Sequence, residues 1–275
     1  MVCVSFLTDY GLADGFVAAC HGVIVRELPD ARIIDITHLV PPGDIRRGAE
    51  ILAQTVAYLP VGVHLAVVDP GVGTSRRPVA VQTEHGWLVG PDNGLLVAAA
   101  DTLGGALAAY ALAVSPGTPA TFHGRDVFAP AAARLARGEA PGGLGAPVDP
   151  EGLVRPRPPI ARLAPPGEVE TEVALVDHYG NVQFAARPEL LAQAGLRPGG
   201  TALVTRAGGS PLAGPPFGVT FGSVAAGELV LYVDSAGRVA LAVNRGNAAA
   251  RLGLAAGDVV RIGPADAGSG GLGQP

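Results

Sequence analysis

The feature that most constrains the fold is an apolar run at residues 65–68 that stops at a carboxylate, Asp69. The chain then turns through a proline and two glycines and reaches two arginines, Arg76 and Arg77. Proline fixes one backbone angle and glycine adopts conformations closed to other residues, so this turn can approach a ligand closely. Open α/β sheets bind their ligands at such points, where a parallel strand ends. We therefore expect a strand that leads into a functional loop.

Short apolar runs alternate with segments of helical periodicity in the first half of the chain. The predicted strands are residues 2–7, 32–36 and 63–68, with a predicted hairpin formed by 78–82 and 86–89. The predicted helices are 14–28, a segment capped by Asp44, a segment that begins near residue 95, and 127–135. This alternation indicates an α/β domain whose mostly parallel sheet is covered by helices on both faces.

The second half of the chain has a different pattern. Prolines crowd residues 155–167 without periodicity, which predicts an interdomain linker. Short predicted strands follow at 172–176, 201–205, 218–221, 228–233, 239–243 and 259–262. Turn residues separate these strands, as is typical of a small antiparallel barrel or sandwich. The expected organisation is an α/β domain at 1–160, a smaller β domain at 168–263 and a disordered tail at 264–275.

Charge and composition exclude several classes of function. The net charge is −5 and no basic tract occurs, so a nucleic-acid-binding surface is not supported. All 19 Lys+Arg residues are arginines. A Schiff-base lysine and a phosphate loop of the GK[ST] type are therefore excluded.

The cysteines and the apolar segments indicate where the protein acts. Cys3 and Cys20 are expected in the core and allow no disulfide framework or zinc spacing. No apolar stretch is long enough to span a bilayer, and the N-terminus lacks a secretory leader pattern. We expect a cytoplasmic protein with no membrane partner.

Acidic, amide and hydroxyl residues directly follow several of the apolar runs. They are Asp9, Asp69, Asn93, Asp177, Asn181 and Ser235. Each of them alone is typical of a turn or a helix cap. Together they predict strand ends from both domains that converge on a polar cleft.

Among the six histidines, His123 is the best placed for chemistry, because it lies between an aromatic residue and a glycine just before a predicted helix. We expect His38 and His178 to be structural. The other three, His21, His64 and His85, are expected on a helix surface, a strand edge or a loop. No HxH or HxxxH spacing occurs, so the sequence predicts no metal site.

Six motifs occur in order along nearly the whole chain: FLTDYG at 6–11, VDPGVGTSR at 68–76, GPDNGL at 90–95, FHGRD at 122–126, DHYGN at 177–181 and VNRGNA at 243–248. They resemble the motifs of the S-adenosylmethionine (SAM) hydroxide adenosyltransferases, the adenosyl-forming SAM hydrolases. That family is related to the SAM-dependent fluorinase and chlorinase. The resemblance implies an N-terminal α/β domain that binds SAM, a C-terminal β domain that completes the site, and a homotrimer with active sites between neighbouring subunits. It implies SAM as the substrate and no cofactor.

The resemblance also implies roles for individual residues. The family's Asp-Arg-His set falls on Asp69, Arg76 and His123, which are the predicted catalytic residues. Asp9 falls where a carboxylate binds the ribose hydroxyls, and Phe122 where an aromatic ring lies near the sugar and the reacting carbon.

The remaining predicted substrate contacts are Asn93 and a group for the methionine end, which are Asp177, Asn181 and Ser235. The chain departs from the family's halogenases directly after this serine. They carry an arginine there, whereas this chain has Ala236. The methionine carboxylate must therefore be bound by backbone or by another residue.

The implied reaction is attack of water on C5′ of SAM, which releases neutral methionine and needs no general acid. The water must be oriented and must lose a proton, and Asp69 and His123 are both able to accept it. Arg76 would keep Asp69 ionised.

Two alternatives remain. A halogenase would bind a halide in the same place, but burying an anion beside Asp69 is costly, so the sequence favours water. A non-catalytic SAM or nucleoside sensor has no need of Asp69, Arg76 and His123 together.

Overall fold

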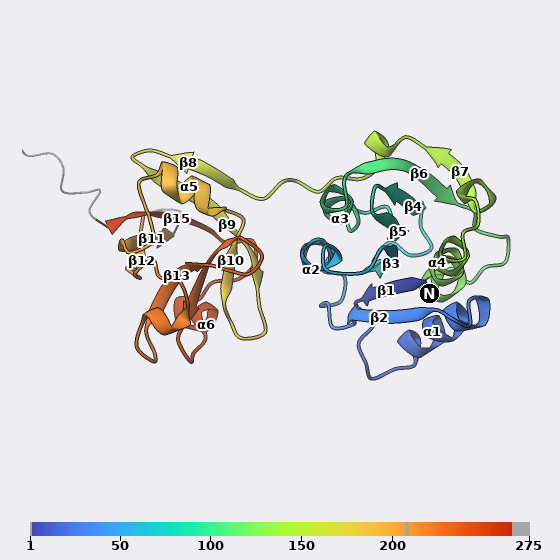
Figure 1. The fold of residues 1–275 in the computed structure, drawn as a ribbon, viewed down its shortest axis with the longest axis horizontal. Helices are drawn as coiled ribbons and strands as arrows, with labels where there is room; N and C mark the ends of the chain where they lie inside the picture. Colours follow the sequence, from blue (N-terminus) through green and yellow to red (C-terminus); the bar gives the residue numbers. More distant parts are fainter. Residues whose placement is uncertain (1, 207–208, 266–275) are drawn as a thin grey trace, which may run out of the picture. The chain divides into compact units, whose positions relative to one another are not determined.

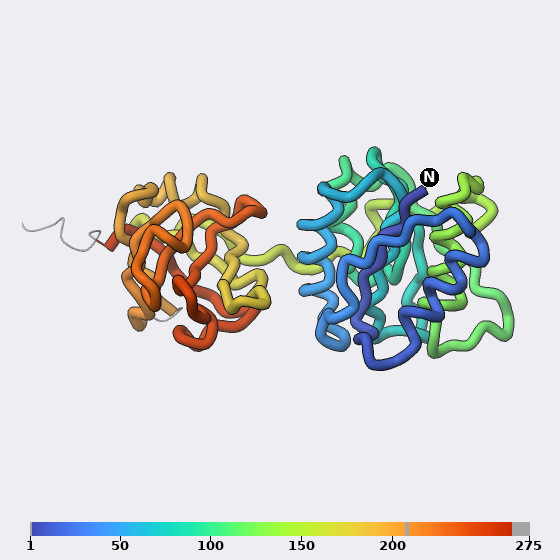
Figure 2. Tube along the Cα trace, turned by 60° about the horizontal axis from the view of Figure 1, so that its bottom comes forward, coloured from blue at the N-terminus to red at the C-terminus, as the bar shows by residue number. Residues whose placement is uncertain are grey.

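The chain divides into two compact units, residues 1–156 and 157–275. The computed structural model describes residues 2–206 and 209–265, shown as a ribbon in Figure 1 and as a tube in Figure 2. The predicted tail at 264–275 begins inside the last strand, and residues 266–275 lie outside the described part. No helix within the described ranges is both long enough and apolar enough to cross a bilayer.

The first unit is built on a seven-stranded sheet in the order β2-β1-β3-β5-β4-β6-β7. In that order the strands are Arg32–Thr37, Cys3–Thr8, Gly62–Val67, Gly86–Pro91, Pro78–Thr83, Ala106–Leu112 and Gly145–Val148. The pairs from β2 to β5 are parallel and those from β5 to β7 are antiparallel. The sheet is therefore mixed, and the prediction of a mostly parallel sheet is not confirmed. The reason is that the β4–β5 hairpin, itself correctly predicted, is followed by two further antiparallel pairs, β4–β6 and β6–β7, so the strand direction alternates from β5 to β7.

Helices cover both faces of this sheet, as predicted. Helices α1 (Phe16–Glu27) and α4 (Ala129–Ala136) pack on one face, and α2 (Ile45–Val56) and α3 (Val97–Thr102) pack on the other. Alternate residues of β3 supply both cores, since Leu65 faces α4 and the adjacent Ala66 faces α2. Two short 3-10 helices, Pro141–Gly143 and Pro150–Gly152, complete the unit.

One local signal is confirmed in this unit, and one element was not predicted. Asp44 caps α2, because its carboxylate accepts the Arg47 N–H at 3.0 Å. The segment before α4, Gly124–Phe128, is a π-helical turn that follows His123 directly. Such turns are rare and occur frequently at functional sites.

One histidine is not where the sequence predicts it. His64 lies on the central strand β3, is 1% exposed, and its Nδ1 is 2.8 Å from the Ser5 hydroxyl of β1. The expected surface position for His64 is therefore wrong. The imidazole is tolerated in the core because the serine satisfies one ring nitrogen, and burial lowers its pKa to about 4.

The second unit is an antiparallel, barrel-like sheet in the order β12-β11-β15-β9-β10-β14-β13, with β8 paired to β9. From β8 to β15 the strands are Ala161–Ala164, Glu168–Val176, Val182–Phe184, Ala202–Arg206, Pro211–Ala213, Leu229–Val233, Val239–Val243 and Val259–Pro264. Helices α5 (Pro188–Gln193) and α6 (Ala248–Leu252) pack against the same apolar core.

The segment at residues 215–218 closes this barrel. Phe217 forms an isolated β-bridge with Leu231 on the edge strand β13, and Pro216 forms one with Thr201 beside β11. One loop therefore links the edge strand β13 to the start of β11 near the other side of the sheet, which makes the barrel nearly closed. The short strands predict an antiparallel barrel or sandwich, and the observed form is the barrel-like one.

Two expectations for the second unit are wrong in detail. Residues 218–221 do not form a strand, because Thr220 and Ser223 make a reciprocal capping box that starts a 3-10 turn at Phe221–Ser223. The proline-rich stretch 155–167 contains strand β8, whose backbone pairs with β9 although no periodicity marks it.

Candidate active site

The candidate site of the first unit lies where the parallel strands end. Asp9 follows β1, Asp69 follows β3, and Asn93 follows β5. The carboxyl ends of parallel strands lie at one edge of a sheet, so these loops are neighbours. The Asn93 amide donates to the Val68 carbonyl at 2.9 Å and accepts the Leu95 N–H at 3.2 Å. Asn93 thus holds the residue before Asp69 in place, and its contact with substrate stays a prediction.

The glycine-rich turn after Asp69 folds back on itself. The Thr74 hydroxyl donates to the Gly71 carbonyl at 2.7 Å and accepts the Arg76 N–H at 3.3 Å. Gly73 has a positive φ of 75°, and a Cβ there would lie 2.6 Å from the Ala120 carbonyl. The turn therefore returns Arg76 to the carboxylate where the loop began.

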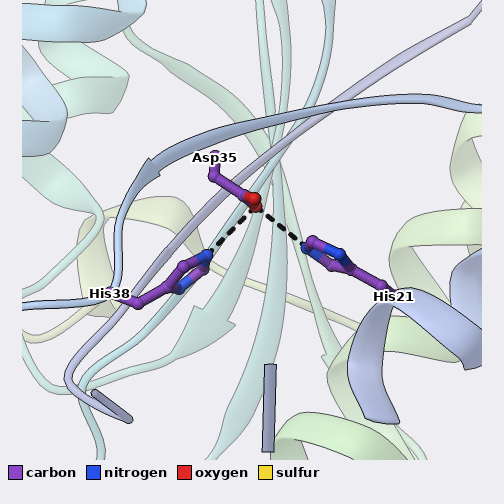
Figure 3. Close-up of side chains that lie close together, drawn as sticks. All are labelled: His21, Asp35 and His38. Atoms are coloured by element: carbon purple, nitrogen blue, oxygen red, sulfur yellow. Dashed lines mark hydrogen bonds and ion pairs between the residues drawn. The ribbon is translucent and has the colours of Figure 1, made fainter. Parts of the chain in front are cut away.

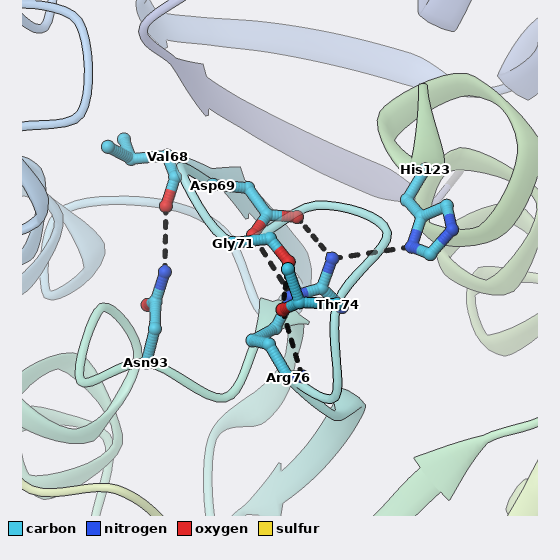
Figure 4. A network of polar contacts seen from close by, with 7 residues as sticks. All are labelled: Val68, Asp69, Gly71, Thr74, Arg76, Asn93 and His123. Carbon is cyan, nitrogen blue, oxygen red and sulfur yellow. Dashed lines mark hydrogen bonds and ion pairs between the residues drawn. The ribbon is translucent and has the colours of Figure 1, made fainter. Parts of the chain in front are cut away.

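Arg76 and Asp69 form a buried two-point ion pair (Figure 4). The Arg76 Nε donates to Asp69 Oδ1 at 3.0 Å, and Nη2 donates to Oδ2. The two side chains are 7% and 6% exposed, respectively. The guanidinium lies 5.4 Å from the Phe128 ring centre, which shields it from water on that side. This geometry fixes both oxygens of Asp69 relative to the strand end.

His123 joins the pair from a distant segment of the chain. Its Nδ1 is 3.3 Å from Arg76 Nη2, as Figure 4 shows. An arginine has donors only, so Nδ1 is the acceptor and the proton of the neutral ring lies on Nε2. The sequence prediction grouped Asp69, Arg76 and His123, and in the structure they form one hydrogen-bonded array.

Burial sets the protonation of this array. It raises the pKa of Asp69, while the Arg76 guanidinium opposes that shift. Burial also lowers the pKa of His123, and the nearby Arg76 lowers it further. Asp69 is thus a stronger base than an exposed carboxylate, and His123 is neutral at neutral pH.

One donor of the array has no protein partner. Within residues 2–206 and 209–265, the buried Nη1 of Arg76 meets no hydrogen-bond acceptor. A buried guanidinium N–H without an acceptor is costly. Of the three guanidinium nitrogens, Nη1 is therefore the one that donates to neither Asp69 nor His123.

Three aromatic rings pack together at the same edge of the sheet. Phe122 meets Phe16 edge-to-face at 5.3 Å and Tyr10 at 5.7 Å between ring centres. A Cβ on Gly124 would lie 2.0 Å from the Tyr10 hydroxyl, so the ring needs a glycine there. Sequence reasoning identified Phe122 but missed Tyr10 and Phe16. Their only signal is that Tyr10 directly follows Asp9.

Asp9 is half-buried beside these rings. Its Oδ2 accepts the Gly43 N–H at 2.8 Å, which orients the carboxylate. The charge of Asp9 also contributes to the raised pKa of Asp69, after the effect of burial. Its other oxygen accepts no hydrogen bond within residues 2–206 and 209–265, and a carboxylate at this edge is suited to accept a pair of hydroxyl donors.

The second unit brings together two of its three predicted residues. Asp177 Oδ1 accepts the N–H groups of Tyr179 and Asn181, both at 2.9 Å, and Oδ2 accepts the Asn181 side-chain amide at 2.7 Å. Gly180, with φ +82°, packs so closely on Asn247 that a Cβ would lie 2.1 Å from its side chain. The Asp177–Asn181 turn is therefore built before any ligand arrives.

Ser235 lies elsewhere in this unit. It is exposed in the turn between β13 and β14, whereas the register of β14 with β10 puts the Asp177–Asn181 turn at the opposite end of that strand. The Ala236 N–H next to it donates to Asp234 Oδ1 at 2.9 Å. The role of Ser235 stays a prediction. Asp234, which also accepts the Gln183 amide, was missed by the sequence reasoning.

Comparison with known proteins places these residues in a family. Residues 4–145 match the SAM hydroxide adenosyltransferase N-terminal domain, and residues 171–261 match the C-terminal domain of the same name.

Individual proteins agree with this match. The chain is 54% identical to an (R)-S-adenosyl-L-methionine hydrolase of Salinispora tropica, covering 94% of this chain and 97% of that protein. It is 42% identical to an (R)-S-adenosyl-L-methionine hydrolase of Thermus thermophilus, with 94% and 98% covered. A fluorinase of Actinopolyspora mzabensis is 27% identical, with 94% and 96% covered.

A solved structure also matches across both units. An uncharacterised conserved protein from Thermotoga maritima superposes with a TM-score of 0.85 at 33% identity, covering 94% of this chain and 99% of that one. The matched domains, the identity to the two hydrolases and the shared fold agree with the six motifs. The chain belongs to the SAM hydroxide adenosyltransferase family.

Proposed function

We propose that this chain hydrolyses SAM to adenosine and L-methionine. The observation that carries the proposal is the buried array of Asp69, Arg76 and His123 at the end of the central parallel strands. The proposal is supported by the two relatives named as SAM hydrolases, at 54% and 42% identity over most of the chain.

In this reaction the oxygen of a water attacks C5′ of SAM opposite the sulfonium. The C5′–S bond breaks, and its electron pair stays on sulfur to give the neutral thioether of methionine. The water loses one proton. The leaving group is already cationic, so neither an acid nor a cofactor is needed to expel it. We therefore propose that the chain works without a cofactor.

Asp69 is the proton acceptor in this proposal. Its pKa is raised by burial, which strengthens it as a base, and both of its oxygens keep lone pairs beyond those that Arg76 uses. His123 is less suited, because its Nδ1 already accepts from Arg76 and its pKa is lowered. Arg76, a permanent cation bonded to Asp69, would favour the hydroxide form of the attacking oxygen through its charge.

The substrate contacts in this proposal follow the family resemblance. Asp9 would accept both ribose hydroxyls, and Phe122 with its neighbouring rings would pack against the sugar. The Asp177–Asn181 turn would bind the ammonium group of methionine, and Ser235 and Asn93 are weaker candidates for further contacts. The 1–160 domain would bind SAM and carry the chemistry, and the 168–263 domain would complete the site.

We also propose a homotrimer that acts in the cytoplasm. Three large apolar side chains beside the Asp9 loop are strongly exposed: Leu12 at 68%, Phe16 at 45% and Leu39 at 65%. Clustered exposed apolar residues of this kind favour coverage by a partner surface. Light scattering on the eluting protein tests the assembly, and a mass near three times the 27.5 kDa chain is expected.

A halogenase is the alternative that shares this scaffold. Halide attack would place an anion against the carboxylate of Asp69, which is buried and ionised by its pairing with Arg76. This repulsion supports water as the nucleophile.

The deciding experiment is chromatography of SAM incubated with the purified protein, with and without chloride and fluoride. Adenosine and methionine in halide-free buffer are expected. A halogenated deoxyadenosine would show that the chain is a halogenase and not a hydrolase. SAM that binds by calorimetry but gives no product would favour the sensor.

A further inference from the structure

Two histidines and an aspartate come together on the first unit, apart from the Asp69 array (Figure 3). His21 lies on α1, Asp35 on β2 and His38 just after β2. Their nearest ligand atoms all lie within 4.8 Å of one another. Asp35 Oδ1 is hydrogen-bonded to His21 Nε2 at 2.9 Å and lies 3.0 Å from His38 Nε2 without a hydrogen bond to it. A helix, a strand and a loop thus bring two imidazole nitrogens next to one carboxylate oxygen.

The His38 ring is held in a specific orientation. It is 4% exposed, and its other nitrogen, Nδ1, lies 2.9 Å from the Thr8 hydroxyl. Phe6 packs edge-to-face on the same ring at 5.0 Å between centres. Histidines that bind metals are oriented in this way, with the nitrogen away from the metal bonded to an oxygen.

The Nε2 of His38 is the second observation that points to a ligand. Although it is close to Asp35, it makes no hydrogen bond of acceptable geometry with any residue in 2–206 or 209–265. Two atoms that bind one ion point toward the ion and not toward each other. A buried nitrogen that lies near a carboxylate without bonding to it fits this arrangement.

The site is accessible from solvent on one side. The side chains of His21 and Asp35 are 29% and 45% exposed. An ion can therefore reach the cluster while His38 forms its buried wall. Neutral imidazoles and a carboxylate are ligands for Zn²⁺ and similar divalent transition metals, and such sites keep open positions for water.

We propose that His21 Nε2, His38 Nε2 and Asp35 bind a divalent transition metal ion, with Zn²⁺ as the ion to test. The proposal departs from the prediction of no metal made from histidine spacing. Spacing along the sequence does not identify this group, because its members come from a helix, a strand and a loop. They are not neighbours on one element.

The ion would stabilise the loop that carries Asp9 and would take no part in the chemistry. The Thr8 hydroxyl that contacts His38 also accepts the Tyr10 N–H at 3.2 Å. The His38 carbonyl accepts the Gly11 N–H at 2.8 Å. Through its ring His38 contacts Thr8, and through its carbonyl it contacts Gly11, so it is bonded to the chain on both sides of Asp9.

The test uses the full-length chain without a polyhistidine tag, stripped of metal with a chelator and dialysed. Titration calorimetry with Zn²⁺ and elemental analysis after dialysis are expected to give one ion per chain. Co²⁺ should give visible absorption bands of an imidazole-ligated ion of low coordination number.

His21→Ala and Asp35→Asn are the decisive variants, because both positions are partly exposed and their loss leaves the buried His38 in place. Each should weaken Zn²⁺ binding by at least about 10–100-fold, the range seen even for outer-shell changes. His85→Ala, at an exposed histidine in the β4–β5 turn, is the matched control and should bind Zn²⁺ like the parent.

Equal Zn²⁺ binding by His21→Ala and the parent would overturn the proposal. So would the absence of binding by a parent chain that is folded by circular dichroism, since the cluster would then be a hydrogen-bonded array only. Neither readout uses SAM turnover, so the result is independent of the proposed hydrolysis.

Discussion

The two units present their polar residues in opposite ways. The Asp69 array of the first unit joins two segments of the chain, because Arg76 lies in the same turn as Asp69, seven residues on, and His123 lies a further 47 residues along the chain. The Asp177–Asn181 turn of the second unit makes its bonds within five residues. The first is assembled by the whole sheet and buried, while the second is a local structure at the surface. The difference suggests that reacting groups need a rigid fold around them, whereas a group that only binds needs a stable turn.

Removing the base of the assembled array should have the largest effect. Asp69→Ala is expected to lower kcat by about 10²–10⁴-fold, the usual contribution of a positioned base. SAM affinity by calorimetry should largely survive, because Asp69 is proposed to act on water. Undiminished turnover in this variant would remove Asp69 from the mechanism.

The packing behind the array should be the next most sensitive feature. Gly124→Ala places a methyl group against the Tyr10 ring and should lower the free energy of unfolding by about 1–3 kcal/mol. Gly22→Ala in α1 is the matched control, because its Cβ meets nothing within 4 Å and alanine favours a helix by about 1 kcal/mol. Urea denaturation followed by circular dichroism measures both. Equal stabilities would show that the Tyr10 contact is not tight.

A change in the local turn should affect binding rather than rate. Asp177→Asn keeps an acceptor oxygen for the turn but removes the charge, so we expect KM for SAM to rise about 10-fold with a smaller change in kcat. His178→Ala, at the exposed neighbour, is the control and should leave both constants unchanged. A fall in kcat at constant KM would give the second unit a part in the chemistry.

The smallest expected effect concerns pH. The pKa of His123 is lowered by burial and by Arg76, so the ring should stay neutral from pH 8 down through its ordinary value of about 6.5. The profile of kcat/KM should therefore be flat within about twofold there, and should fall at lower pH as Asp69 is protonated. A loss of activity centred near 6.5 would mean that the ionisation of His123 controls the rate.

The contrast between local structure and structure assembled from distant segments also explains what the sequence could predict. Asp44 as a helix cap, the β4–β5 hairpin and the strand ends at Asp9 and Asp69 follow from local patterns. The β6 strand was not predicted, because four of its seven residues are alanine, which favours a helix. Its extended form depends on pairing with β4.

The site shows the same limit. The family motifs identified Asp69, Arg76 and His123, but the protonation of His123 depends on a contact across 47 residues. Tyr10 lies within the FLTDYG motif but was not singled out, and Phe16 carries no mark of function, because the packing of both rings on Phe122 arises only in the fold. His21, Asp35 and His38 meet only after α1 has packed on the sheet.

The Ser5–His64 pair in the middle of the sheet limits how acidic the working conditions can be. The pKa of His64 is about 4 in the folded chain, below its ordinary value near 6.5, so between these values the unfolded chain binds more protons. His64 therefore does not reduce the free energy of unfolding above pH 6.5. As the pH falls from 6.5 toward 4, it reduces this free energy by on the order of 3 kcal/mol. The buried imidazole of His64 thus makes the folded state less stable in acid, independently of the pH dependence of the reaction.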